Sequence, residues 1–174
     1  QQLGGIVDHD EFGAFVDTSW NLTEQFILNL GLRYTAEEKK ADINVVADCR
    51  PIRPDKWAPS CDPGFSDKED WSNVSPAVGV QYYLNDDTQI YASWKRGYRS
   101  GGFNIRNSSG LTFSPKYDEE VVDNYELGIK ADISDTLRIN ASYFHAVYDD
   151  LQRVVVQEDS SQRTLNAAKA TIQG

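Results

Sequence analysis

The sequence predicts an all-β fold, namely an antiparallel up-and-down segment of a transmembrane β-barrel. Three observations lead to it: runs of alternating apolar and polar residues, connections that alternate between short turns and long loops, and aromatic residues at both ends of the runs. Period-two alternation gives a sheet one apolar and one polar face. Runs of roughly 9–11 residues are long enough to cross a bilayer as tilted strands.

A hairpin near the middle of the second half shows the pattern most fully. Strands are expected over residues 125–133 and 137–148, with a short turn at residues 134–136. Apolar side chains take alternate positions in both: Tyr125, Leu127, Ile129, Ala131 and Ile133, then Leu137, Ile139, Ala141, Tyr143 and Val147. An antiparallel hairpin with one apolar face follows.

The same alternation predicts five further strands. They are expected over residues 11–20, 26–34, 74–84, 90–98 and 163–174, and residues 1–10 carry no clear pattern. Short turns are expected at residues 21–24 and 85–88, and long loops over residues 37–70, 100–120 and 157–162. Pro76 counts against a central strand of a soluble sheet, since proline cannot donate to the ladder. Seven is an odd number of strands, whereas bacterial single-chain barrels use even numbers, so we expect further strands outside this sequence.

Connection lengths predict the orientation of these strands. Every short turn falls at one end of the sheet and every long loop at the other, as in outer-membrane barrels with short periplasmic turns. Aromatic residues of the apolar face lie at both ends and form two girdles: Trp20 and Tyr82 by the turns, Tyr34, Tyr98 and Tyr125 by the loops. Two sets of side chains are expected on opposite faces. Lipid should contact Leu28, Leu30, Leu32, Val78, Val80, Leu127, Ile129 and Ile139, and the lumen should contain Asn29, Arg33, Gln81, Glu126, Lys130 and Asn140.

Composition narrows the classes of function. The net charge is −10, from 17 Lys and Arg against 27 Asp and Glu, which argues against nucleic-acid binding. No apolar run approaches the ~18 residues of a membrane helix. The chain starts at Gln1 and has no methionine. We therefore expect a piece of a longer protein.

Two cysteines lie in one polar, proline-containing segment. Cys49 and Cys61 are expected to form a disulfide that closes a loop in an oxidising compartment. Free thiols and half of a metal site are the alternatives, and the second is disfavoured because His9 and His145 are remote in sequence.

No catalytic, cofactor or metal constellation stands out. The pairs Asp86–Asp87 and Asp149–Asp150 lie at strand ends, where acids are solvated, and neither has calcium-loop spacing. The expected loops do contain cationic and aromatic residues that could contact an anionic ligand: Arg50, Arg53, Lys56 and Trp57, with Arg96, Arg99 and Arg106. The alternative is that neighbouring acids neutralise them: Asp48, Asp55, Asp62 and residues 118–120. The sequence predicts a binding protein rather than an enzyme.

Several stretches resemble the TonB-dependent outer-membrane receptors. They are residues 91–104, which read YASWKRGYRSGGFN, residues 125–130 (YELGIK), 137–144 (LRINASYF), 148–152 (YDDLQ), 166–170 (NAAKA) and 172–174 (IQG). The resemblance implies that residues 1–174 form part of a 22-stranded barrel, filled by a plug domain, in the outer membrane of a Gram-negative bacterium. This sequence contains no plug, no coupling box and no terminal strand with an aromatic end.

The resemblance also implies a function. Such receptors import scarce ligands, which are ferric siderophores, cobalamin or some glycans, with energy from a periplasmic coupling protein. Expected partners are the imported ligand, that coupling protein, and outer-membrane lipid and lipopolysaccharide. A passive or structural outer-membrane barrel and a soluble secreted glycan-binding β-domain are the alternatives.

Overall fold

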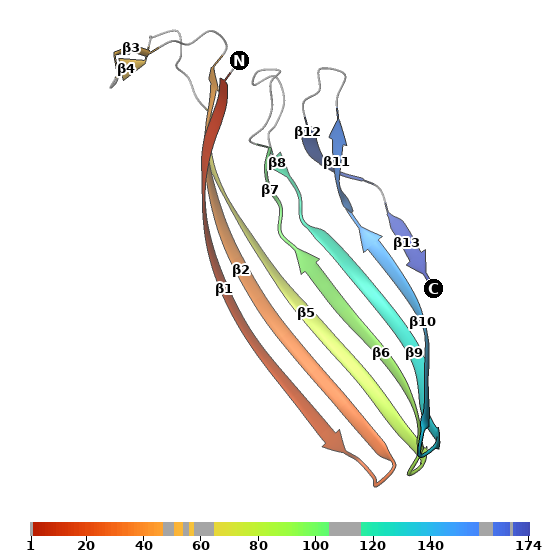
Figure 1. Cartoon of the computed structure of the whole chain (residues 1–174). Helices are drawn as coiled ribbons and strands as arrows, with labels where there is room; N and C mark the ends of the chain where they lie inside the picture. The colour runs from red at the N-terminus through yellow and green to blue at the C-terminus, as the bar shows by residue number, and fades with distance from the viewer. Residues whose placement is uncertain are drawn as a thin grey trace.

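A computed structural model describes residues 2–46, 51–53, 56–57, 65–104, 116–156, 162–167 and 169–174. Seven strands form one antiparallel sheet, in the order β1, β2, β5, β6, β9, β10, β13 (Figure 1). Their bounds are β1 Gln2–Asn21, β2 Phe26–Val46, β5 Phe65–Asn85, β6 Thr88–Arg99, β9 Glu120–Ser134, β10 Leu137–Asp149 and β13 Ala170–Gln173. In the described ranges, no helix has the length and apolar character needed to span a membrane. The sheet is open, with β1 and β13 as its edges. The predicted all-β, up-and-down segment is therefore confirmed.

Three short ribbons lie at the end of the sheet where the long connections are (Figure 1). They are β3 (Pro51–Arg53) with β4 (Lys56–Trp57), β7 (Gly102–Phe103) with β8 (Lys116–Tyr117), and β11 (Gln152–Val156) with β12 (Gln162–Asn166). We call this end the loop end, and the opposite one the turn end.

The turn end is built from tight, side-chain-bonded connections. Thr23 Oγ1 accepts from the backbone N–H of Gln25 at 3.2 Å and of Phe26 at 3.0 Å, and Asn85 Oδ1 accepts from the N–H of Asp87 at 3.0 Å. Polar residues with short side chains favour such turns because they bond the backbone locally. All three predicted short turns lie at this end (Figure 1).

Register sorts the side chains into two faces. Leu28 is paired with Val80, Val80 with Ala92, and Ala92 with Leu127, which places this apolar row on one face. One position along, Asn29, Gly79, Ser93 and Glu126 form the matching row of the other face. The two predicted sets of side chains thus lie on opposite faces. Leu127 is 61% exposed and Leu32 48%, so the apolar face packs against no protein core in this segment.

The loop predicted over residues 37–70 contains two long strand extensions. Strand β1 starts at Gln2, β2 continues to Val46 and β5 starts at Phe65, so residues 37–46 and 65–70 are strand and not loop. These extensions lie beyond the apolar rows of the sheet, and ion pairs join their side chains. Lys68 Nζ lies 2.6 Å from Glu38 Oε2, for example. Charged residues on both faces hid these extensions from a period-two pattern.

The predicted strand over residues 163–174 is wrong in extent. Residues 162–166 form β12 and pair with β11, while only Ala170–Gln173 join the sheet beside β10. The Asn166 side chain donates from Nδ2 to the Asp150 carbonyl oxygen at 2.9 Å, and the Ala167 N–H donates to the Leu151 carbonyl oxygen at 2.7 Å. These bonds close the ribbon before the chain enters β13.

On the loop-end side of Pro76, strands β5 and β6 are no longer paired with each other. The β5–β6 ladder begins at Ala77, which is paired with Lys95, one residue after Pro76. Beyond it, β5 is paired with β2 as far as Phe65, and β6 with β9 as far as Arg99. Pro76 has no N–H to donate, which explains why the ladder stops there. We call the interval between residues 65–76 of β5 and 96–99 of β6 the seam.

Candidate ligand-binding mouth

Side chains, not backbone, close the seam at the loop end. The Lys39 ammonium donates to Ser100 Oγ at 2.5 Å and to the Gly101 carbonyl oxygen at 2.8 Å. Lys39 Nζ also lies 5.5 Å from the ring centroid of Trp71, whose ring meets that of Phe103 edge to face at 6.2 Å. Lys39 and Trp71 share the polar face with Asn29. These five residues, Lys39, Trp71, Ser100, Gly101 and Phe103, form what we call the rim cluster.

The rim cluster is tightly packed. Phe103 is 8% exposed, Ser100 7%, and the neighbouring Ala41 is fully buried. A Cβ on Gly101 would lie 2.6 Å from Trp71 Nε1 and would also meet the Tyr117 carbonyl oxygen. Only glycine allows the chain to pass this close to the tryptophan ring.

A carboxylate neutralises the cation of the cluster. Glu37 Oε2 accepts from Ser100 Oγ at 2.5 Å and lies 3.0 Å from His9 Nε2 and 3.3 Å from Lys39 Nζ. Burial raises the pKa of Glu37, but the bonds from Ser100 and Lys39 outweigh it and hold the pKa below its ordinary value. Lys39 is therefore committed to structure rather than to an anionic ligand.

A second network fixes the β11–β12 ribbon to its neighbours. Gln152 is 7% exposed, and its Nε2 donates to the carbonyl oxygens of Ser100 and Asp118, both at 2.9 Å. Its backbone N–H donates to Glu120 Oε2 at 2.6 Å. Asn104 and Thr164 exchange two bonds, at 2.9 Å and 2.6 Å. The connections after β6 and β10 thus form one hydrogen-bonded block.

An ion pair joins this block to the extension of β5. Lys116 Nζ lies 2.9 Å from Asp67 Oδ2 and also contacts Glu69 Oε2. The two carboxylates, Glu69 first, raise the pKa of Lys116, and the Lys116 ammonium in turn lowers the pKa of Asp67. Strand β8 is therefore tied across the seam by charge as well as by packing.

The predicted ligand-contacting residues are distributed unevenly. Arg53 lies in β3 and Trp57 in β4, whose register pairs Pro51 with Trp57. Arg99 ends β6 with an exposed side chain, on the polar face. Arg50, Arg106 and the predicted disulfide cysteines, Cys49 and Cys61, lie outside the described residues.

Arg96, which the sequence also offered as a contact for an anionic ligand, lies on the apolar face instead. It donates from Nε and Nη2 to the Asp123 carboxylate at 3.0 and 2.7 Å. Arg96 and Trp94 are two positions apart in β6, so their side chains lie on the same face of the sheet.

Sequence reasoning missed the residues that build the rim. Lys39 fell in the loop predicted over residues 37–70, and Trp71 lay between that loop and the strand predicted from residue 74. Gln152 and Asn166 carry no pattern that predicts a shared network. One signal was present, because Gly101 and Phe103 belong to the Ser-Gly-Gly-Phe run at residues 100–103. Adjacent glycines beside an aromatic residue are typical of a close backbone approach.

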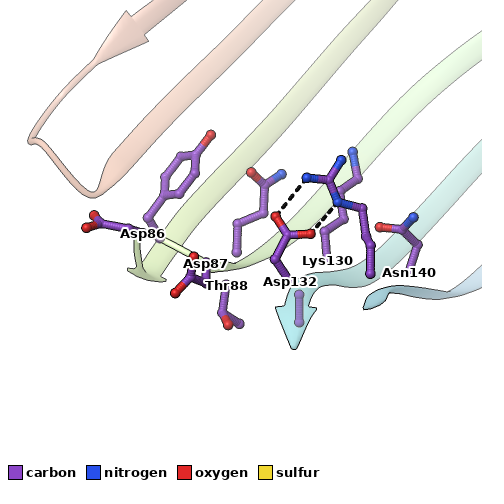
Figure 2. Close-up of a pocket in the computed structure, with 10 residues that line it drawn as sticks. Asp86, Asp87, Thr88, Lys130, Asp132 and Asn140 are labelled. Carbon is purple, nitrogen blue, oxygen red and sulfur yellow. Dashed lines mark hydrogen bonds and ion pairs between the residues drawn. The ribbon is translucent and has the colours of Figure 1, made fainter. Parts of the chain in front are cut away.

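A pocket lies at the turn end, on the polar face (Figure 2). Its volume is about 330 Å³, and its lining includes Asp86, Asp87, Lys130, Asp132 and Arg138. Arg138 forms a bidentate ion pair with Asp132, shown dashed in Figure 2, with Nη2 at 2.7 Å from Oδ2. The Asp132 N–H also donates to the Asp87 carbonyl oxygen at 2.8 Å.

The acids of this pocket are either exposed or paired with Arg138. Asp86 and Asp87 are exposed, as predicted for solvated acids. Within the described ranges, no three His, Cys, Asp or Glu side chains are grouped so that they could hold a metal ion.

Known proteins identify the fold and family. The family model described as "TonB dependent receptor-like, beta-barrel" matches residues 2–174. The pesticin receptor of Yersinia enterocolitica is 26% identical over 171 residues, which are 98% of this chain and 23% of that protein. The pesticin receptor of Yersinia pestis is 26% identical over 148 residues, 85% of this chain and 20% of that protein. The chain thus spans about a quarter of the length of these relatives.

Solved structures agree on the fold. The ferric yersiniabactin uptake receptor FyuA of Yersinia pestis matches with a TM-score of 0.78 at 22% identity, over 99% of this chain and 24% of that one. The copper transporter OprC matches with a TM-score of 0.70 at 19% identity, over 97% of this chain and 26% of that one. The predicted outer-membrane location is confirmed. From the usual orientation of such barrels, we expect the apolar face to contact lipid, the polar face to line the lumen, and the loop end to be extracellular. The chain belongs to the TonB-dependent receptor family and forms part of the β-barrel of a Gram-negative outer-membrane protein.

Proposed function

We propose that this segment belongs to a TonB-dependent receptor that imports a scarce ligand of the ferric siderophore type by energy-coupled active transport. The observation that carries the proposal is the family match over residues 2–174. Two structural neighbours support the ligand class by name, the ferric yersiniabactin uptake receptor FyuA and the alcaligin receptor FauA of Bordetella pertussis. The proposed process has no enzymatic step.

The rest of the proposal concerns parts and partners. Sequence outside these 174 residues would supply the remaining strands and a plug domain, and a periplasmic energy-coupling protein would act on the plug. Lipid and lipopolysaccharide would contact the apolar face.

The ligand would enter at the mouth, where the predicted contacts are Arg50, Arg53, Trp57, Arg99 and Arg106. Arg99 is the best placed. Its side chain is exposed on the luminal face, and it forms no hydrogen bond or ion pair with the part of the chain that the structure describes.

Transport by the full-length protein tests the proposal. Uptake is compared in the native host and in a strain that lacks the receptor, with radiolabelled iron as ferric yersiniabactin, ferric enterobactin or ferric alcaligin, and with labelled cobalamin and a labelled oligosaccharide beside them. We expect deletion to abolish uptake of one ferric chelate, and a protonophore to stop the same uptake in the intact strain. Uptake that persists with the protonophore would instead indicate a passive barrel. If uptake of every probe is unchanged on deletion, the import proposal is wrong.

A further inference from the structure

The apolar face of the sheet contains a hollow on the periplasmic side of Trp94 and Tyr125. Its volume is about 390 Å³, and its lining is dominated by apolar and aromatic side chains of four strands. Ala92 forms its floor, between Val80 on one neighbouring strand and Leu127 on the other. Trp94 and Tyr125, which face each other one row further out, bound its extracellular end. The hollow exists because a small residue interrupts a face of large ones.

Polar donors lie directly beyond this hollow. Arg96 Nε and Nη2 donate to Asp123 at 3.0 and 2.7 Å, and Trp94 Nε1 donates to Asp123 Oδ1 at 2.9 Å. The carboxylate is thus satisfied by three donors and holds the guanidinium in place. A guanidinium is a planar fork, so its Nη1–Nη2 edge points away from that carboxylate. Nη1 has no hydrogen bond with any described residue, and the Arg96 side chain is 39% exposed.

The height of Arg96 matches the membrane interface. It lies eight residues beyond Thr88, the first residue of β6. At ~3.3 Å per residue and the usual strand tilt, this places Arg96 about 20 Å above the periplasmic turns, close to the outer edge of an apolar band ~25 Å tall. Lipid phosphates of the outer leaflet lie just beyond this band, within reach of a long arginine side chain that extends toward the interface.

We propose that the hollow binds one acyl chain of a phosphorylated outer-leaflet lipid, with the free edge of Arg96 donating to its phosphate. The apolar lining fits the chain, and a fixed guanidinium with two outward donors fits a phosphate better than a sugar hydroxyl. The site deepens the lipid contact in the proposed function and rests on that part of it. It is independent of which ligand is imported.

Native mass spectrometry of the full-length receptor, extracted in mild detergent, tests the site. We expect the wild type to retain one phosphorylated lipid per barrel. Ala92→Phe fills the hollow and Arg96→Gln removes the phosphate donors, and each should lower the retained fraction about tenfold. Ala92→Leu is a milder filling variant, in case the phenylalanine prevents assembly.

Two matched controls should retain the lipid. Leu32→Phe adds the same aromatic group to the same face outside the hollow, and Arg138→Gln breaks the other bidentate Arg–Asp pair at the periplasmic end. Equal retention in Ala92→Phe, Arg96→Gln and the wild type would overturn the proposal. So would retention of unphosphorylated lipid only, or a protein dimer without lipid. Iron uptake is measured separately, so a failed import proposal leaves this result readable.

Discussion

The membrane wall and the extracellular rim of this segment differ in what holds their strands together. In the wall, backbone ladders join every neighbouring pair of strands from β1 to β10, and side chains of the apolar face such as Leu127 are exposed. Luminal side chains there form small local groups, such as Tyr91, which donates to Glu126 at 2.6 Å and whose ring centroid lies 5.4 Å from Lys130 Nζ. At the rim the ladder between β5 and β6 ends, and buried side chains replace it.

This difference shows where side-chain identity matters. In the wall the backbone sets the structure, and each side chain needs only to suit the medium it contacts. At the rim, Lys39, Trp71 and Gln152 each make bonds or packing contacts that no ladder duplicates. Substitutions in the wall should therefore change local stability little, and substitutions at the rim should lower it.

The largest effect should come from Gly101→Val, which breaks the rim and spares the wall. The new side chain would overlap Trp71 and the Tyr117 carbonyl, and overpacking against backbone costs about 3 kcal/mol. Hydrogen exchange of the full-length receptor should then accelerate over residues 100–104 and 116–120, and stay unchanged over residues 26–34. The control is Gly79→Ala in the wall, where the nearest atom to a new Cβ is Asn29 Cβ at 3.7 Å. Equal acceleration in both regions would remove the distinction between them.

A smaller effect is expected from Gln152→Ala, which sharpens the comparison by removing hydrogen bonds without adding bulk. It would leave the Ser100 and Asp118 carbonyls without their Gln152 donor, at a cost of about 2 kcal/mol. Limited proteolysis should cut the β11–β12 ribbon faster than in the wild type. Gln162→Ala, an exposed glutamine of the same ribbon, serves as the control and should be cut at the wild-type rate. Unchanged cleavage of Gln152→Ala would show that the ribbon is held by other contacts.

The smallest effect concerns pH and the tie across the seam. Lys116 holds the pKa of Asp67 below its ordinary value, so this ion pair contributes stability above the unfolded pKa of ~3.9 and loses it as the pH falls through the lower folded value. Spin labels at Ser66 and Asp118 of the full-length receptor should report a broader distance distribution at a pH below that folded value than at pH 6. In Lys116→Gln the distribution should be broad at both values. Persistent narrow distances at low pH would assign the tie to the rim cluster alone.

The wall could be predicted from sequence because lipid and lumen impose a binary choice on each position. Alternation at residues 26–34 and 125–133 therefore predicts both strand and face. The turns could also be predicted, because the side chains of residues such as Thr23 and Asn85 form hydrogen bonds with the backbone of the same turn.

The rim could not be predicted in the same way. Its strands carry charged residues on both faces, such as Lys39 on one and Glu38, paired with Lys68, on the other, and these leave no periodic signal. Its central contacts join residues far apart in sequence, such as Lys39 and Ser100, and neither residue type indicates the other. The β12 and β13 strands were merged for a related reason, because the bonds of Asn166 that separate them are also long-range.

The seam above Pro76 also allows the two regions to evolve separately. Within a continuous sheet, an insertion of one residue would invert the facing of every later side chain in that strand. No ladder crosses the seam, so a change of register in the outer part of the β2–β5 hairpin need not change the pairing of β6 with β9. The side-chain contacts that close the seam, such as that of Lys39 with Ser100, would then have to be replaced. A receptor could in this way change its outer surface and keep the strand pairing of the barrel beneath it.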